Sequence, residues 1–388
     1  MLVKSLPPGA VEPCVVCPDG YAVRLLEDAH IARRTIPGVS MFWSITAAPL
    51  RGRRLLELAR TLWFMRYGSV LRRAIHEFRP DVVHLNDWGM FHAAAIARRS
   101  GVPVVMHART VADRGHWALV LAKRLLKKYV ARVIAIDESV RLSLQGLVQC
   151  EVIYNPLDTT TRGSGGRPLA LGGESPVRVS FLANLLAHKG VWDLLDCARI
   201  LRARRNIVFQ VAGGNSRPLE FYRTWRGRLA SLLGLVSDVE CAARERIVRD
   251  RLEDRVLMLG HVEDIDEFLD STDILVFPSR LNGPGRSVFE AGIRGIPAVV
   301  ALADRVEDIV EDDVTGLIVP ERDPTALAAA VERLAGDPVL RARLGTNAQR
   351  KYRLQFDPAR IGQRILDVYV SVVGEGAVST PTRPASQI

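Results

Sequence analysis

Short apolar runs alternate with longer stretches whose apolar positions recur at helical spacing along nearly the whole chain. In the first half, these patterns predict strands at 11–18, 81–85, 102–108, 131–137 and 150–156, and helices at 51–78, 90–101, 117–129 and 138–147. In the second half, they predict strands at 177–184, 207–213, 255–260, 273–278, 297–302 and 316–320, and helices at 190–204, 217–252, 264–270 and 287–294, followed by two C-terminal helices. Continuous Val- and Ile-rich runs that alternate with helices are typical of parallel sheets covered on both faces. The chain is therefore predicted to be an α/β protein.

A stretch rich in Gly, Ser, Thr and Pro at 159–176 interrupts the alternation and is expected to be a linker. The length of 388 residues also favours two domains. We expect Rossmann-like domains at 1–158 and 177–352, a helix at 353–373 that crosses back to the first domain, and a disordered tail at 374–388. Because parallel sheets bind ligands at the carboxyl ends of their strands, two such domains predict a site in a cleft between them.

Polar residues gather where the predicted strands end. In the first half these are His84, Asn86 and Asp87 after one strand, and His107 and Arg109 after the next. In the second half they are Asn184, Lys189, Gly213, Gly214 and the segment 278–290. One histidine at a strand end is more often structural than functional, but the recurrence at the same end of several strands favours a binding site.

The segment 278–290 has the composition of a phosphate site. Gly283 and Gly285 lie in a loop where backbone can approach a ligand closely, and the helix that opens near Ser287 directs amide groups towards it. Lys189 and Arg286 are suited to the same anion. Glu290 would repel phosphate, so we interpret it as an acceptor for ribose hydroxyls, in preference to an ordinary solvated helix acid.

The composition indicates the cell compartment of the protein and whether a metal site is expected. The sequence contains no run of 18 uncharged apolar residues and no visible signal peptide, which predicts a cytoplasmic protein. Its five cysteines are few and scattered, as in a reducing compartment. Cys14 and Cys17 fall on opposite faces of a predicted strand with no second ligand pair, so we interpret them as structural and expect no metal site.

The net charge of +10 belongs to the first half alone, because residues 1–165 carry 23 Lys and Arg against 13 Asp and Glu, whereas the remainder is balanced. No nucleic-acid motif accompanies this charge. The segment 51–79 contains eight arginines among Leu, Trp and Phe, so it is either a peripheral contact with an anionic membrane or an ordinary domain helix. The long helical segment 217–252 carries Tyr222 and Trp225, and we favour a surface helix there over a partner or membrane contact.

Residues 176–370 resemble the C-terminal domain of the family-4 retaining glycosyltransferases of GT-B fold. The resemblance rests on FLANLLAHKGVWDLL, VAGG, VLMLGHVEDIDEFLDSTDILVFPS, FEAGIRGIPAVV and DIVEDDVTGLIVPERDPTALAAAVERL in that order. In the first half, RPDVVHLN, GVPVVMHAR and EVIYNPLD agree less specifically. The resemblance implies a sugar nucleotide bound mainly by the second domain, a glycan or lipid-linked acceptor bound mainly by the first, retention of anomeric configuration, and no metal ion or cofactor.

The resemblance also implies roles for individual residues. Glu290 matches the second glutamate of the family's E-x7-E motif, which binds the donor ribose, and Lys189 matches the lysine on the donor diphosphate. His107 matches the histidine that faces the transferred sugar, and Gly283 and Gly285 match the loop next to the sugar and phosphates. With the strand-end residues, this predicts a catalytic group of His107, Asn282 and Lys189, a donor site of Glu290, Lys189, Asn184, Gly213, Gly283, Gly285, Arg286 and Ser287, and an acceptor side of His84, Asn86 and Arg109.

Three departures from the family pattern leave alternatives open. Asn282 stands where the family usually has its first glutamate, and Asn184 stands where it usually has an arginine. The pattern of the family's opening strand and Gly-rich loop is not found before residue 11, so we expect a misassigned start or an incomplete first domain.

We predict a retaining glycosyltransferase of cell-surface polysaccharide or glycolipid assembly. The alternatives are a degenerate homologue that binds a sugar nucleotide or a partner protein, and a sugar-nucleotide 2-epimerase.

Overall fold

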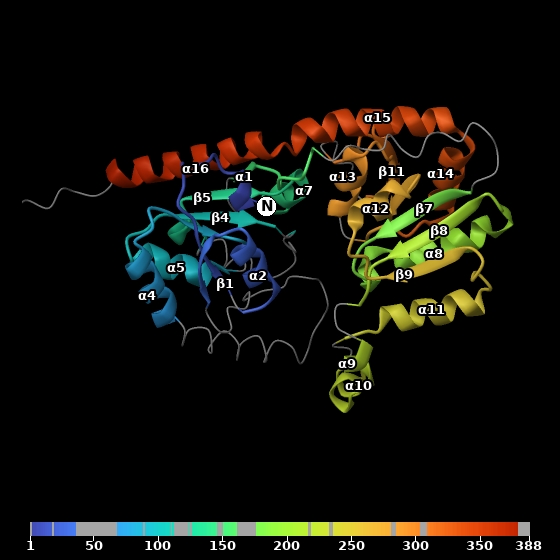
Figure 1. Ribbon diagram of the computed structural model, residues 1–388, viewed down its shortest axis with the longest axis horizontal. Coiled ribbons are helices and arrows are strands. Elements are labelled where there is room, and N and C mark those ends of the chain that lie inside the picture. Colours follow the sequence, from blue (N-terminus) through green and yellow to red (C-terminus); the bar gives the residue numbers. More distant parts are fainter. Residues whose placement is uncertain are drawn as a thin grey trace, which may run out of the picture. The chain divides into compact units, whose positions relative to one another are not determined.

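The computed structural model describes residues 2–17, 19–35, 68–87, 90–109, 111, 124, 126–145, 150–160, 176–215, 219–232, 236–280, 285–302 and 309–378 (Figure 1). The chain divides into two compact units. Unit 1 consists of Met1–Pro156 and Pro358–Ile388, and unit 2 consists of Leu157–Asp357. The helix at the C-terminus therefore belongs to the unit formed by the first part of the chain, and most of the predicted linker, 161–175, lies outside the described residues.

The described residues of unit 1 form two parallel sheets. The larger has the order β3-β4-β5-β6, and the smaller pairs β1 with β2. The strands of this unit are β1 Cys14–Cys17, β2 Ala32–Thr35, β3 Val83–Leu85, β4 Val104–Ala108, β5 Arg132–Ala135 and β6 Cys150–Val152. Its helices are α1 Leu2–Ser5, α2 Tyr21–Asp28, α4 Gly68–Phe78, α5 Phe91–Arg99, α7 Glu138–Ser143 and α16 Pro358–Val378.

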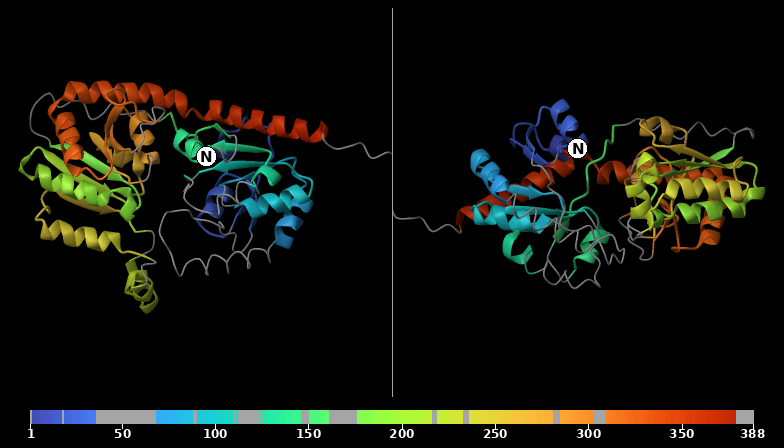
Figure 2. Two further views of the ribbon diagram at one scale, coloured as in Figure 1. Left: turned by 180° about the vertical axis from the view of Figure 1, so that it is seen from behind. Right: turned by 90° about the horizontal axis from the view of Figure 1, so that it is seen from below.

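Both faces of the β3–β6 sheet are covered, which explains why its strands are continuous apolar runs. One face packs Val104, Met106 and Val133 against the helix α5. The other face packs Val105, Ile134 and Ile153 against α16, which contributes Ile361, Ile365, Val368 and Val372 at helical spacing. Figures 1 and 2 show α16 lying along β4 and β5. This second face carries the histidines described below.

In unit 2, the described residues form a doubly wound sheet of six parallel strands in the order β12-β11-β10-β7-β8-β9. The strands are β7 Val177–Leu182, β8 Ile207–Ala212, β9 Val256–Gly260, β10 Ile274–Phe277, β11 Ala298–Ala301 and β12 Gly316–Val319. The helical elements are η2 Ala187–Lys189, α8 Val191–Ile200, η3 Leu201–Ala203, α9 Leu219–Arg223, α10 Trp225–Leu232, α11 Val239–Arg249, α12 Ile265–Asp270, α13 Arg286–Ile293, α14 Pro324–Gly336 and α15 Pro338–Gln355. The predicted α/β class with parallel sheets is thus confirmed.

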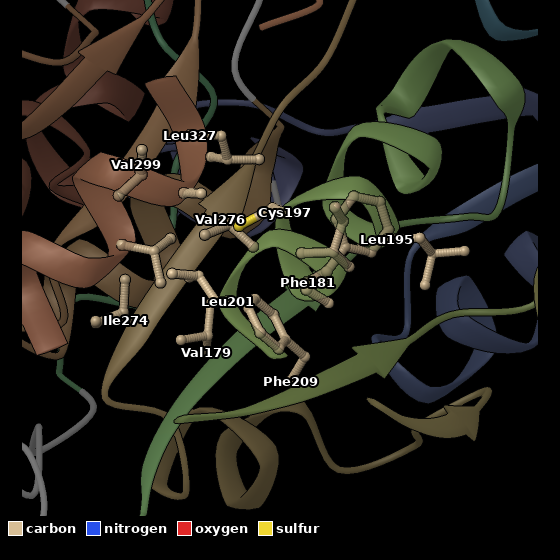
Figure 3. Packing of buried hydrophobic residues seen from close by; sticks show 14 of the residues in the cluster. Val179, Phe181, Leu195, Cys197, Leu201, Phe209, Ile274, Val276, Val299 and Leu327 are labelled. Carbon is tan, nitrogen blue, oxygen red and sulfur yellow. The ribbon is translucent and has the colours of Figure 1, made fainter. Parts of the chain in front are cut away.

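The core of unit 2 lies between the sheet and the helices α8, α11 and α14. Figure 3 shows Phe181 and Phe209 of β7 and β8 beside Leu195 and Cys197 of α8, all of them buried. At roughly 25 cal/mol per Å² of buried apolar surface, each such side chain stabilises the unit by about 1.5–3 kcal/mol. This rigid core fixes the directions in which the strand ends point.

Two local predictions differ from the structure. The segment 217–252 is divided into α9, α10 and α11, because the Thr224 hydroxyl accepts from the Gly227 N–H (3.0 Å) and begins a new helix at Trp225. The disordered tail was predicted to begin at Gly374, but α16 continues to Val378. Since a helix adds residues cheaply once its first turns are held by packing, α16 continues beyond Val372, the last buried residue among its described side chains.

Candidate functional site

The carboxyl ends of β7, β8 and β10 form the centre of the candidate site in unit 2. The chain runs from β7 to β8 on one side and later returns to place β10 on the other side of β7. Such a reversal leaves the loops after the two neighbouring strands free to separate, and ligands of doubly wound sheets bind there. The loop after β7 carries Lys189, and the loop after β10 leads into α13 with Ser287 and Glu290. The elements that carry Lys189, Ser287 and Glu290 therefore meet at the carboxyl edge of the sheet.

Two glycines permit the close approach of these loops. Gly190 has φ +90°, and a Cβ built on it would lie 1.8 Å from the Pro278 carbonyl oxygen. Gly213 has φ +138°, and its Cβ would lie 1.9 Å from the carbonyl oxygen of Ala183. Any other residue would therefore push neighbouring loops apart in addition to straining its own backbone. Gly213 lies beside Asn184, which is exposed directly after β7.

Lys189 supplies a positive charge at this edge. Its ammonium nitrogen lies 5.4 Å from the centroid of the Phe277 ring, in cation–π contact with the last residue of β10. Burial lowers the pKa of Lys189 from its usual value. No ion pair of Lys189 is found within the described part of the chain. The charge is thus oriented and partly desolvated, which strengthens its attraction for an anion.

The first turn of α13 presents hydrogen-bond donors to the same place. Gly285 precedes the helix without a side-chain cap, and a Cβ on it would meet the Phe277 ring at 2.4 Å. The Ser287 hydroxyl is buried and has no hydrogen-bond partner among the described residues. Helix N-termini with free amide groups attract anions, and a buried unsatisfied hydroxyl is costly unless a ligand bonds to it. Both features fit a bound phosphate.

Glu290 lies one turn further along α13. Its Oε1 accepts from Nε of Arg286 at 2.7 Å. Burial raises the pKa of the Glu290 carboxyl, and the Arg286 guanidinium opposes this rise. Arg286 therefore compensates part of the negative charge of the Glu290 carboxylate. The two oxygens of an ionised Glu290 carboxylate are acceptors of the kind that vicinal hydroxyls need.

An ion pair that the sequence analysis did not single out joins the two loops. Arg280, directly after β10, donates to both carboxylate oxygens of Asp193 at 3.1 and 3.2 Å. Its backbone N–H also donates to the carbonyl of His188 at 2.8 Å. Asp193 is buried in the first turn of α8. The pair holds the Lys189 loop against the β10 loop. The signal that the sequence offered was one acid, Asp193, within the otherwise apolar run VWDLL.

One residue of the predicted catalytic group and one of the predicted donor site fall in the segment 281–284. Asn282 and Gly283 lie outside the described residues. Within the ranges that are described, no group of three or more His, Cys, Asp or Glu side chains could hold a metal ion. None of the helices in those ranges is both long and apolar enough to cross a bilayer.

Unit 1 carries the predicted catalytic histidine and acceptor-side residues. His84 of β3 and His107 of β4 lie on the face covered by α16, with ring centroids 5.3 Å apart. The Nδ1 atom of His84 makes a 2.8 Å hydrogen bond with the Tyr369 hydroxyl of α16. His107 is fully buried, and in the described part of the chain neither of its ring nitrogens makes a hydrogen bond of ordinary geometry, although the backbone of Ile153 lies close enough to raise the His107 pKa slightly. Tyr369 is a second residue that the sequence analysis did not identify.

Burial controls the protonation of both histidines. It lowers the pKa of His84 to about 4, and the nearby Arg109 guanidinium adds to the effect. It lowers the pKa of His107 to about 2, again with a contribution from Arg109. Both rings are therefore neutral at physiological pH. A neutral His107 can donate or accept a hydrogen bond, but it does not carry a positive charge.

Arg109 lies beside the buried Asp87, whose Oδ1 accepts from the Arg109 backbone N–H at 3.3 Å. Burial lowers the pKa of Arg109, and Asp87 opposes the shift. Asn86 is exposed at the end of β3. The predicted acceptor-side residues of unit 1 thus comprise a partly buried cation and an exposed amide beside the neutral histidine pair.

Models of two glycosyltransferase families match the two halves of the chain. Residues 173–351 match the model of the glycosyl transferases group 1, and residues 2–161 match that of glycosyltransferase family 4. The chain is 29% identical over 339 residues to an alpha-D-kanosaminyltransferase of Streptomyces kanamyceticus, covering 79% of this chain and 81% of the relative. It is 29% identical over 195 residues to an N,N'-diacetylbacillosaminyl-diphospho-undecaprenol alpha-1,3-N-acetylgalactosaminyltransferase of Campylobacter jejuni, covering 50% of this chain and 45% of that protein.

Among solved structures, the chain resembles Anabaena HepE in complex with UDP, with a TM-score of 0.72 and 22% identity over 92% of both chains. The same protein has been solved in complex with UDP-glucose. At this identity the likeness shows the fold alone, and that fold is the predicted GT-B type.

Proposed function

Because the chain belongs to the family-4 glycosyltransferases of GT-B fold, we propose that it transfers a sugar from a nucleoside-diphosphate sugar to a glycan or lipid-linked acceptor, with retention of anomeric configuration and without a metal ion. The Campylobacter jejuni relative is named for an undecaprenol-linked acceptor, which supports the acceptor class. The UDP bound by HepE makes a uridine nucleotide the first donor to test.

The observation that carries this proposal is the meeting of Lys189, the N-terminus of α13 and Glu290 at one sheet edge in unit 2. A nucleoside diphosphate needs positive charge and N–H donors for its phosphates, and acceptors for its ribose hydroxyls. Lys189 and the amide groups near Ser287 would bind the diphosphate. Glu290 would bind the ribose.

In the proposed reaction, the bond between the sugar C1 and the diphosphate oxygen breaks, and a bond between C1 and the acceptor oxygen forms on the same face. The acceptor hydroxyl proton passes to the departing diphosphate. Negative charge grows on that leaving group, so Lys189 and the α13 amides stabilise the transition state more than the ground state. His107, as a neutral hydrogen-bonding group, would contact the transferred sugar, and Asn282 its hydroxyls. His84, Asn86 and Arg109 are proposed for the acceptor side.

The experiment measures thermal stabilisation of the purified chain by UDP-, GDP-, ADP- and dTDP-sugars, for wild type and Glu290→Ala. A ligand at 100 times its dissociation constant stabilises the folded state by about 2.7 kcal/mol. The matched control is Glu332→Ala, since Glu332 is also a helix acid paired with an arginine, Arg204, but in α14. We expect one nucleotide to stabilise wild type and the control and to lose most of its effect in Glu290→Ala.

Donor turnover is then measured with that nucleotide sugar. Release of nucleoside diphosphate, with or without an acceptor, supports a transferase. Release of an epimerised free nucleotide sugar would support the epimerase alternative. Stabilisation without any turnover would support a non-catalytic binding protein, and equal stabilisation of Glu290→Ala would refute the assigned ribose contact.

A further inference from the structure

The helices α9 and α10 form a small pair that projects from unit 2 (Figure 1). They pack closely on each other, because Gly227 of α10 leaves space for the Phe221 carbonyl, which a Cβ would approach to 1.9 Å. Tyr222 is buried, and the Thr224 hydroxyl donates to the Phe221 carbonyl at 2.7 Å. The side of the pair on which the two helices face each other is thus held by packing and hydrogen bonding within the pair.

The outer side of α10 is apolar instead of polar. Trp225, Leu229 and Leu232 occur at positions i, i+4 and i+7, so they form one stripe along the helix. Their side chains are 70%, 47% and 84% exposed. Single exposed apolar residues are ordinary, but a stripe of a large aromatic and two leucines on a projecting helix marks an interaction surface.

Arginines border this stripe. Arg223, Arg226 and Arg228 are exposed, against one acid in the pair, Glu220. The Arg226 guanidinium lies 5.4 Å from the Trp225 ring centroid. None of the three arginines forms an ion pair within the described ranges. Apolar side chains with arginines on either side, and a tryptophan between them, have the composition of a segment that lies in the interface of a membrane.

We propose that the α9–α10 pair docks unit 2 onto an anionic lipid surface, with Trp225, Leu229 and Leu232 inserted among the acyl chains near the headgroups. The three arginines would bind the lipid phosphates. The positive charge of the three arginines favours anionic lipid over a second copy of the chain as the partner of this surface. A second copy docking through the same stripe would bring six arginines together, whereas anionic lipid complements them.

The test is co-sedimentation of the full chain with vesicles of phosphatidylcholine containing 30% phosphatidylglycerol, and with vesicles of phosphatidylcholine alone. We expect preferential binding to the anionic vesicles, weakened by salt. The triple variant Trp225→Ser, Leu229→Ser, Leu232→Ser should bind at least about tenfold more weakly, given the apolar area that it removes. The matched control is Val339→Ser, which changes a side chain 77% exposed on α15.

The contribution of the arginines to vesicle binding is tested with a separate pair of variants. Arg226→Ser with Arg228→Ser should lower the partition coefficient by about 25-fold, since each arginine near such a surface contributes roughly fivefold. Arg202→Ser with Arg205→Ser, two exposed arginines elsewhere in unit 2, is the control and should change binding little. All altered residues are exposed, so melting temperatures should stay at the wild-type value.

Unchanged vesicle binding in the stripe variant would overturn the proposal, as would equal binding to neutral and anionic vesicles. So would a wild-type dimer in sedimentation equilibrium that the stripe variant converts to monomer, because the second copy would then be the occupant. The stripe variants should still bind donor nucleotide, and Glu290→Ala should still bind vesicles. Failure of this proposal and failure of the proposed function are therefore distinguishable.

Discussion

Replacement of Gly190 by alanine tests whether the contact between the two loops of unit 2 builds the donor site. The new Cβ would lie 1.8 Å from the Pro278 carbonyl oxygen and 2.4 Å from its carbon, which are backbone atoms that cannot rotate away. The backbone at φ +90° adds strain for any residue with a Cβ. The left-handed conformation costs about 1–2 kcal/mol and overpacking about 1–3 kcal/mol, so we expect a loss of about 2–5 kcal/mol.

Gly260→Ala is the matched control. Gly260 also has positive φ, at +71°, but a Cβ on it would meet nothing within 4 Å. It should therefore carry only the backbone cost of about 1–2 kcal/mol. The difference between the two variants isolates the steric contact with Pro278.

Hydrogen–deuterium exchange of peptides from β7 and β10 measures the free energy of opening in unit 2 without interference from unit 1. Gly190→Ala should also weaken nucleotide binding, since relief of the clash moves Lys189 away from the β10 loop, while Gly260→Ala should bind normally. Equal stability losses in the two variants, or wild-type nucleotide affinity in Gly190→Ala, would refute the reasoning.

Two further predictions concern buried charge and pH. Arg280→Ala leaves the buried carboxylate of Asp193 unpaired, so it should destabilise unit 2 by about 1–3 kcal/mol and raise the donor dissociation constant, whereas Arg204→Ala, at a surface ion pair, should cost about 0–1 kcal/mol. Urea denaturation and nucleotide titration measure both; equal losses would show that the Arg280–Asp193 pair is an ordinary surface contact. Since burial lowers the pKa of His84 to about 4 and that of His107 to about 2 from the usual 6.5, the unfolded chain binds more protons than the folded one below pH 6.5. Unit 1 should therefore lose stability as pH falls from 6.5 towards 4, by roughly 1 kcal/mol per pH unit for each histidine, and His107→Gln should flatten this slope while the exposed His261→Gln should not. Pulse proteolysis at pH 7 and pH 5, with fragments of unit 1 identified by mass spectrometry, measures the slope, and an unchanged slope in His107→Gln would contradict the neutral buried state.

The sequence determined the features that depend on neighbouring residues. Continuous apolar runs are sufficient to predict buried parallel strands, and glycine, serine and lysine at the following junctions are sufficient to predict an anion site. Lys189, Ser287 and Glu290 were identified in this way, and the structure brings the loops that carry them together. The family patterns supported the same positions.

Only the tertiary structure decided which distant residues meet. Arg280 and Asp193 are 87 positions apart, and His84 and Tyr369 are 285 apart, so no local pattern relates them. The order β10-β7-β8 determines the first contact, and the packing of α16 on β4 and β5 determines the second. The exposure of the apolar stripe on α10 was also decided by the tertiary structure. Periodicity shows that Trp225, Leu229 and Leu232 share one face, but whether that face is buried depends on what the rest of the chain leaves uncovered.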